Sequence, residues 1–454
     1  MVNYGRPSKD CAPCRKRKIR CDLIPTGCTQ CRRARLTCHG YRDPKDRTAT
    51  QLPPTLQLGS DVLSRHTFLS LYVDGYSYGF HTLASLLAGS SPRGLLQATV
   101  DAVSLAFMSF RLNRQDIVPL ANKRYLVAIR SLRIAMQSSQ KSSITGVSES
   151  VNDETLQSVL LLDLYEKMAY HHYQLSEFPD SWLSHVQGAL SMVQSRPRTD
   201  YSNPTTQQLA TRTVIALTLS CGAAGVSIPQ TLHSLHHDLD GYVQNAKWTF
   251  IGLLMSLVNF RADMRSGKIK SPDILTRARE LDIQFSHAEG KIPSSWWPRR
   301  VSDFNTQSFG YYYDVYPCHY TTQVFNAYRI MRLELNDVMR KIHPCTSVSE
   351  TIVEVTEAIC ATVPQFILPG VRPDNNLPFT PKQILECSGI LTPLYVAAQV
   401  SDNSAMREWI LRLFIYMADQ GARLAGSVAH ILTSEPGVDY WAVFKMAGSC
   451  AVTA

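Results

Sequence analysis

Six cysteines lie close together near the start of the chain. They form two copies of one pattern, Cys-x2-Cys-x6-Cys, and the second copy follows the first at an offset of 17 residues. Two cysteines with two residues between them can hold one metal ion from a tight turn. The pattern therefore predicts a thiolate metal site built from Cys11, Cys14, Cys21, Cys28, Cys31 and Cys38.

The number of thiolates indicates how many metal ions are bound. Tetrahedral zinc takes four ligands, so two separate zinc sites would need eight cysteines. Six cysteines suffice for two zinc ions if two of the thiolates each bridge both ions. We therefore expect two Zn²⁺ ions per chain, shared within one cluster. A disulfide knot is the alternative use of six clustered cysteines.

The other six cysteines are scattered between residues 221 and 450. A secreted disulfide protein would distribute paired cysteines through its folded body. The concentration of half of them in one short segment instead favours a reducing compartment with one local metal site. We expect the remaining cysteines to be small buried hydrophobic residues.

Positive charge is concentrated in the same segment. Residues 1–50 contain 13 Lys and Arg against 4 Asp and Glu, whereas the rest of the chain contains 33 of each sign. Five of the cations lie at positions 15–20, between the second and third cysteines. We expect this run to form a short helix that brings Cys21 back to the side of Cys14. Metal ligation is expected to stabilise this helix. Such a helix suits phosphate neutralisation and entry into the major groove.

The run CAPCRKRKIRCD, followed by two further cysteines and CHGY, resembles the fungal-type Zn2Cys6 binuclear-cluster DNA-binding domain. The resemblance covers residues 11–38. It implies that Cys11 and Cys28 bridge the two zinc ions. It also implies double-stranded DNA as the partner and a location in the nucleus.

The same resemblance assigns roles to the basic residues. Lys18 matches the lysine that reads a CGG-type triplet, three positions before the third cysteine. Arg15, Arg17 and Arg20 match positions that hold phosphates. The sequence departs from the family in one respect, because Pro25 lies three residues before Cys28, whereas the family commonly has a proline two residues before it, often cis.

Composition divides the chain into three parts. Residues 1–40, which we call the head, are followed by a polar, proline-containing linker at 41–60 and by the body at 61–454. Apolar residues in the body recur with a helical period, so we expect an all-α fold: a small zinc cluster joined by a linker to a large helical domain. The expected helices include 95–112, 116–136, 152–168, 242–261 and 406–424, with a surface loop at 137–151.

Two helix starts are marked in the body. Ser271 precedes a proline and is expected to be an N-cap, and Thr380 with Gln383 has the spacing of a capping box. The uncharged stretch 213–237 has only about fifteen broadly apolar residues before Pro229, fewer than the ~20 that a membrane span needs. We therefore expect a buried core helix there and no membrane association.

The body also has a weaker resemblance. The segments VLLLDLYEKM (159–168), SWLSHVQGALSMV (181–193) and YWAVFKMAGSCAVT (440–453) are similar to the helical regulatory domain that follows this cluster in many fungal transcription factors. An aromatic-rich stretch from Trp296 to Tyr313 is expected to pack on the body, with binding of an effector or a partner protein as the alternative.

These observations together predict a zinc-dependent, sequence-specific regulator of transcription by RNA polymerase II, without enzymatic activity. A homodimer formed through the body, monomeric binding, and contacts with transcription co-regulators all stay open. One rival is an enzyme in the body that uses the zinc head for localisation. Two further rivals are a head that buffers metal and a head that binds RNA. RNA binding would favour exposed aromatic side chains that stack on bases. The head has only Tyr4 and Tyr41 nearby, and both lie outside the cluster.

Overall fold

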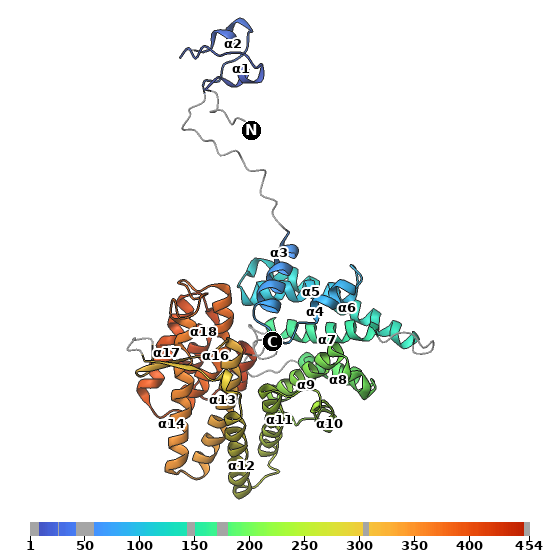
Figure 1. Ribbon diagram of the computed structural model, residues 1–454, viewed down its shortest axis with the longest axis vertical. Helices are drawn as coiled ribbons and strands as arrows, with labels where there is room; N and C mark the ends of the chain where they lie inside the picture. Colours follow the sequence, from blue (N-terminus) through green and yellow to red (C-terminus); the bar gives the residue numbers. More distant parts are fainter. Residues whose placement is uncertain are drawn as a thin grey trace. The chain divides into compact units, whose positions relative to one another are not determined.

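The computed structural model describes residues 9–25, 27–41, 59–142, 150–169, 180–302 and 308–448 (Figure 1). The chain divides into two compact units, Met1–Gly59 and Ser60–Ala454. Residues 42–58 of the expected linker lie outside the described part.

Helices make up nearly all of the regular secondary structure in the described residues, so the all-α prediction is confirmed (Figure 1). The head contains α1 (Ala12–Lys16) and α2 (Thr29–Arg33). The α-helices of the body are α3 (Ser60–Thr67), α4 (Leu83–Gly89), α5 (Leu95–Ala106), α6 (Val118–Ser142), α7 (Ser150–Ala169), α8 (Asp180–Gln194), α9 (Pro204–Ala224), α10 (Gln230–Leu239), α11 (Ala246–Arg265), α12 (Ser271–Gly290), α13 (His319–Ile342), α14 (Thr346–Ala361), α15 (Pro364–Ile367), α16 (Pro381–Val400), α17 (Ser404–Asp419), α18 (Arg423–Ser434) and α19 (Tyr440–Val443). Shorter π and 3-10 turns are η1 (Phe68–Asp74), η2 (Phe107–Arg111), η3 (Gln115–Ile117), η4 (Arg198–Ser202), η5 (Ser294–Trp296) and η6 (Phe444–Gly448).

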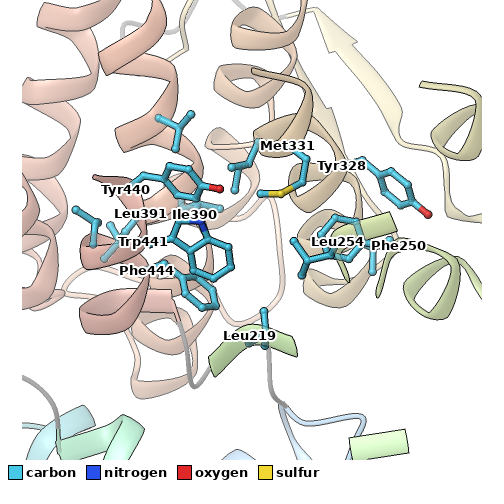
Figure 2. Packing of buried hydrophobic residues seen from close by; sticks show 14 of the residues in the cluster. Leu219, Phe250, Leu254, Tyr328, Met331, Ile390, Leu391, Tyr440, Trp441 and Phe444 are labelled. Carbon is cyan, nitrogen blue, oxygen red and sulfur yellow. The ribbon is translucent and has the colours of Figure 1, made fainter. Parts of the chain in front are cut away.

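The described residues of the body form two apolar cores with α7 between them. One core gathers residues of η1, α5, η2 and α6, and the larger one, part of which Figure 2 shows, gathers residues of α8 to η6. Leu156 and Leu160 of α7 belong to the larger core, whereas Leu161 and Leu164 belong to the smaller one. Because apolar groups cover α7 on opposite sides, this helix is buried almost all round, as expected for a helix that is not amphipathic.

Burial of α7 forces its charged residues to pair inside the protein. The Lys167 ammonium lies 2.6 Å from a carboxylate oxygen of Asp163, one turn earlier, and the two side chains are 1% and 3% exposed. Loss of one partner of such a pair leaves the other charge buried without compensation. The pair therefore ties the stability of the body to two polar residues in a helix that both cores cover.

The expected helices exist, but several boundaries were wrong. The expected helix 406–424 is two helices, α17 and α18, because Gly421 between them has a φ of 110° that ends the first one. The expected helix 242–261 begins four residues later, at Ala246, where the Asn245 side chain accepts a hydrogen bond from the Trp248 N–H. The expected loop 137–151 was wrong at both ends, since α6 reaches Ser142 and α7 begins at Ser150, and residues 143–149 lie outside the described part.

Of the two predicted caps, one is confirmed. Thr380 and Gln383 form a reciprocal capping box at the start of α16. The Ser271 prediction was wrong, because Lys270 occupies the N-cap position and Ser271 is the first residue of α12. Pro272 in the first turn fixes the start of this helix without a side-chain cap.

The aromatic-rich stretch includes the two strands found in the described residues. Strand β1 (Arg299–Ser302) pairs antiparallel with β2 (Tyr312–Val315). The indole N–H of Trp297 donates to the Ile292 carbonyl, and the Trp296 ring packs edge-on against Tyr320. These contacts agree with the expected packing of this stretch on the helical body.

The uncharged stretch 213–237 forms part of the larger core. Helix α9 ends at Gly225, in the left-handed conformation, and α10 begins after Pro229. Val214, Leu217 and Leu219 of α9 are buried, which confirms the expected core helix. None of the helices in the described part of the chain is long and apolar enough to cross a membrane.

Candidate metal centre

The two halves of the head have the same local backbone structure. In the first half the Ile19 N–H donates to the Cys14 carbonyl at 3.1 Å, and in the second the Leu36 N–H donates to the Cys31 carbonyl at 2.8 Å. These bonds are related by the 17-residue offset of the cysteine repeat. The sequence repeat is thus a structural repeat, with one short helix, α1 or α2, in each half.

A left-handed residue follows each short helix, two positions after its last residue. Lys18 has a φ of 53°, and Arg35, its equivalent in the second half, has a φ of 50°. With the hydrogen bonds just described, this geometry is that of a Schellman-type C-terminal cap. The prediction of a helix running through positions 15–20 was therefore wrong. Helix α1 ends at Lys16, and Cys21 returns to the other cysteines through this reversal of the chain.

The cysteine sulfurs come together between the two helices. The Sγ atom of Cys11 lies 3.4 Å from that of Cys31 and 3.7 Å from that of Cys21, and the Sγ atoms of Cys14 and Cys28 are 3.5 Å apart. The sulfurs form two groups, and within each group all sulfur atoms lie within 4.8 Å of one another. Cys11 belongs to both groups. The first group is Cys11, Cys14, Cys21 and Cys28; the second is Cys11, Cys31 and Cys38.

This arrangement fits zinc. Four sulfurs placed at ~2.3 Å around a tetrahedral zinc ion lie about 3.8 Å from one another, and the observed separations of 3.4 to 3.7 Å are close to that value. Membership of Cys11 in both groups is what a bridging thiolate requires. Cys28 belongs to the first group, and its backbone N–H lies 3.5 Å from the Cys38 sulfur, which places it beside the second group.

The surroundings of Cys11 favour the thiolate form that binds metal. Burial opposes ionisation of this thiol, but hydrogen bonds from the Cys14 backbone and from neighbouring cysteines outweigh burial and lower the pKa of Cys11 to about 6. A thiolate is the metal-binding form of cysteine.

Asp22 and Tyr41, for which the sequence predicted no structural role, connect the two halves. Both carboxylate oxygens of Asp22 accept from the Thr29 N–H, at 3.2 and 3.0 Å, at the start of α2. The Tyr41 hydroxyl, just beyond the head, donates to the Ile24 carbonyl. An acidic residue seven positions before a helix start is outside the usual capping spacing, so no local sequence signal identifies Asp22.

The residues expected to contact DNA lie on the surface of the head. Arg15, Arg17, Lys18 and Arg20 are all exposed, and among the described residues none of them forms an ion pair with a carboxylate. Their charges are therefore available to an external polyanion. The structure places Arg15 on α1, Arg17 at its C-cap, Lys18 at the left-handed turn and Arg20 in the segment that leads to Cys21.

Comparison with known proteins identifies the head. Residues 9–48 match the family model of the fungal Zn(2)-Cys(6) binuclear cluster domain. This cluster binds two zinc ions, which confirms the zinc prediction, and it is a domain of DNA-binding transcription regulators. The match does not extend into the body, and neither a curated protein nor a solved structure matches the chain.

The Zn(2)-Cys(6) cluster keeps its sulfur arrangement despite the shifted proline. The one cis peptide bond among the described residues is Leu377–Pro378, so the bond before Pro25 is trans. Gly27 follows with a φ of 115°, a conformation that favours glycine. Thr26 lies outside the described residues.

Proposed function

We propose that the chain is a nuclear, sequence-specific regulator of transcription by RNA polymerase II, and that it reads CGG-like triplets through the first half of its zinc cluster. The observation that carries the proposal is the combination of a Zn(2)-Cys(6) cluster with unpaired, exposed cations around its first helix. In this proposal the body, residues 61–454, is a helical regulatory domain. Its support is its all-helical fold and its position after the cluster.

We assign all six cysteines to the metal. The first zinc ion is held by Cys11, Cys14, Cys21 and Cys28, and the second by Cys31 and Cys38 together with the bridging pair, Cys11 and Cys28. The two sulfur groups and their common member, Cys11, support this division. The zinc ions fix the geometry that two five-residue helices cannot hold by themselves. The apparent free energy of zinc binding at a structural site is roughly 10–16 kcal/mol.

Within the proposal Lys18 reads bases, and Arg15, Arg17 and Arg20 hold phosphates. The left-handed turn projects Lys18 from the end of α1, where the chain reverses. A residue at the end of a short rigid element can reach base edges, while charges on either side meet the backbone.

Two alanine variants separate base reading from phosphate binding. Lys18→Ala is expected to cost about 1–3 kcal/mol on DNA that contains the cognate triplet and to relax the preference for it. Arg17→Ala is expected to weaken binding to all sequences alike and to lower the salt slope by about one. Titrations of cognate and scrambled duplexes at several salt concentrations measure both effects.

Arg35→Ala is the matched control, because Arg35 has the same left-handed backbone in the second half of the cluster. It should leave triplet preference unchanged. Equal, sequence-independent losses in the Lys18 and Arg17 variants would show that the division of roles is wrong.

Assembly through the body is part of the proposal. One cluster in this family reads about three base pairs, so a second copy usually adds specificity. Homodimerisation and binding of co-regulators through the helical body stay predictions. Equilibrium sedimentation of the full chain distinguishes a dimer from a monomer.

A further inference from the structure

A pocket in the body lies where three helices begin. Its volume is about 270 Å³, larger than the roughly 150 Å³ cavity that can hold benzene. The first turns of α9 and α11, the start of α13 and the loop between η1 and α4 contribute to its wall. Tyr78 and His81 of this loop are exposed, so the pocket opens to solvent. Helix N-termini carry partial positive charge, which favours an anion in this space.

Two basic side chains line the pocket. Arg212 of α9 is 8% exposed, and Lys247 in the first turn of α11 is partly buried. Burial lowers the pKa of Arg212 to about 10. Burial and the neighbouring Arg212 charge together lower the pKa of Lys247 to about 8. The charged forms of both groups are therefore disfavoured where they lie.

The Arg212 guanidinium reaches the open space. Its Nη1 atom donates to the Gln157 side chain at 3.4 Å, which is the only hydrogen bond that it forms with described residues. None of the fully enclosed polar atoms that lack a partner in the described part of the chain belongs to Arg212. Its other guanidinium nitrogens are therefore accessible, and the pocket is the space that Arg212 lines.

The protein places little negative charge near these cations. None of the described residues that line the pocket is an aspartate or a glutamate. Asp163 is the carboxylate whose charge raises the pKa of Arg212, and it is already paired with Lys167 at 2.6 Å. Asp240 accepts from the Trp248 indole N–H at 2.9 Å but does not line the pocket. Because buried charges are normally paired, an anion from solution fits this space.

The place of Lys247 in its helix supports the same conclusion. As the second residue of α11, it brings a cation to the positive end of the helix dipole, where acidic residues are favoured. Asn245 already caps this end by accepting from the Trp248 N–H. An anion in the pocket interacts favourably with the helix end and with both cations.

The rest of the wall favours an apolar part on this anion. The Tyr78 and Tyr320 rings pack with their centres 4.5 Å apart, and both line the pocket together with Trp248 and Ile215. Binding sites for small molecules commonly combine such apolar and aromatic surface with a few charged or polar groups. A bare inorganic ion leaves this surface uncovered.

We propose that this pocket binds a small organic carboxylate, with the carboxylate beside Arg212 and Lys247 and the apolar part against Tyr78 and Tyr320. Arginine suits this role because its planar guanidinium can donate two parallel hydrogen bonds to one carboxylate. The inference concerns the body alone and does not depend on how the head binds DNA.

Benzoate is the probe for this site. Benzamide is its neutral counterpart of the same size, and inorganic phosphate is an anion without an apolar part. In ligand-observed NMR titrations of the zinc-loaded full chain, benzoate should bind with a Kd on the order of 1 mM. Benzamide should bind at least about tenfold more weakly because it offers no charge to the two cations. Phosphate at equal concentration should not displace benzoate.

Lys247→Met separates the pocket from the basic head, which can also attract anions. This variant should lower benzoate affinity at least about tenfold. Its thermal midpoint without ligand should be unchanged or higher, because the Arg212 charge and the N-terminus of α11 both disfavour a cation there. The matched control is Lys268→Met, since Lys268 is 67% exposed and pairs with Asp263 at 3.6 Å. The control removes the same charge and should leave benzoate affinity unchanged.

The inference is overturned if benzamide binds as tightly as benzoate, or if phosphate displaces benzoate at equal concentration. It is also overturned if Lys247→Met and Lys268→Met retain the same benzoate affinity, because the anion then binds elsewhere on the chain. A clear fall in the thermal midpoint of Lys247→Met would show that the lysine serves the fold instead. None of these outcomes bears on DNA binding by the head.

Discussion

Replacement of Cys14 by serine is expected to unfold the head and to lower affinity for cognate DNA by at least about a thousandfold, the usual minimum gap between specific and non-specific binding. Cys14 is fully buried among the sulfurs of the first group. Loss of a thiolate ligand removes much of the roughly 10–16 kcal/mol that a structural zinc site contributes. Titration of a CGG-containing duplex measures the loss of affinity.

Cys345→Ser provides the control for this variant. Cys345 is a half-buried cysteine at the start of α14 and takes no part in the sulfur groups. The control should retain wild-type DNA affinity. Both variants should keep the far-UV helicity of the body, because the head and the body are separate compact units. A Cys14→Ser protein that binds cognate DNA normally would contradict the role of Cys14.

Replacement of Lys167 by methionine is expected to destabilise the body by about 3–5 kcal/mol. The Lys167 ammonium lies 2.6 Å from Asp163 inside α7, where both side chains are almost completely buried. Methionine keeps the volume but leaves the carboxylate buried beside an apolar group. Chemical or thermal unfolding followed by circular dichroism measures the change in the free energy of unfolding.

The matched control is Arg412→Met, which breaks an exposed pair of the same spacing. Arg412 lies 2.6 Å from Glu408, and the two side chains are 63% and 68% exposed. This pair should be worth about 0.3–0.5 kcal/mol. The double variant Asp163→Leu with Lys167→Met should recover much of the lost stability, because it removes both charges. Equal small effects for Lys167→Met and Arg412→Met would refute the importance of burial here.

The helical fold could be predicted because apolar spacing reports burial directly. The pattern in 152–168 predicted α7 to within two residues at its start, and the Thr380 capping box marked the first turn of α16. The pattern could not separate α17 from α18. Gly421 interrupts an apolar period that continues across the break, and only the backbone conformation ends the first helix.

The metal centre could be predicted from cysteine spacing, but its backbone could not. The 17-residue repeat implied a shared cluster, and the structure brings the sulfurs of both copies together. The left-handed turn at Lys18 was missed because lysine gives no local signal for a positive φ. The clue was the repeat itself, since it aligns Lys18 with Arg35 and both follow a five-residue helix.

The pocket in the body left no trace in the sequence. Tyr78, Arg212 and Lys247 are far apart along the chain and look like ordinary loop or helix residues by spacing. Their relation depends on how η1, α9, α11 and α13 pack, which local patterns do not encode. Tertiary contacts alone bring these residues around one space.

The zinc content of the purified full chain tests the central claim most directly. Elemental analysis should find two zinc ions per chain, and stepwise chelation should remove them together with affinity for the cognate duplex. A content of one zinc or none, or DNA binding that survives complete removal of the metal, would contradict the account.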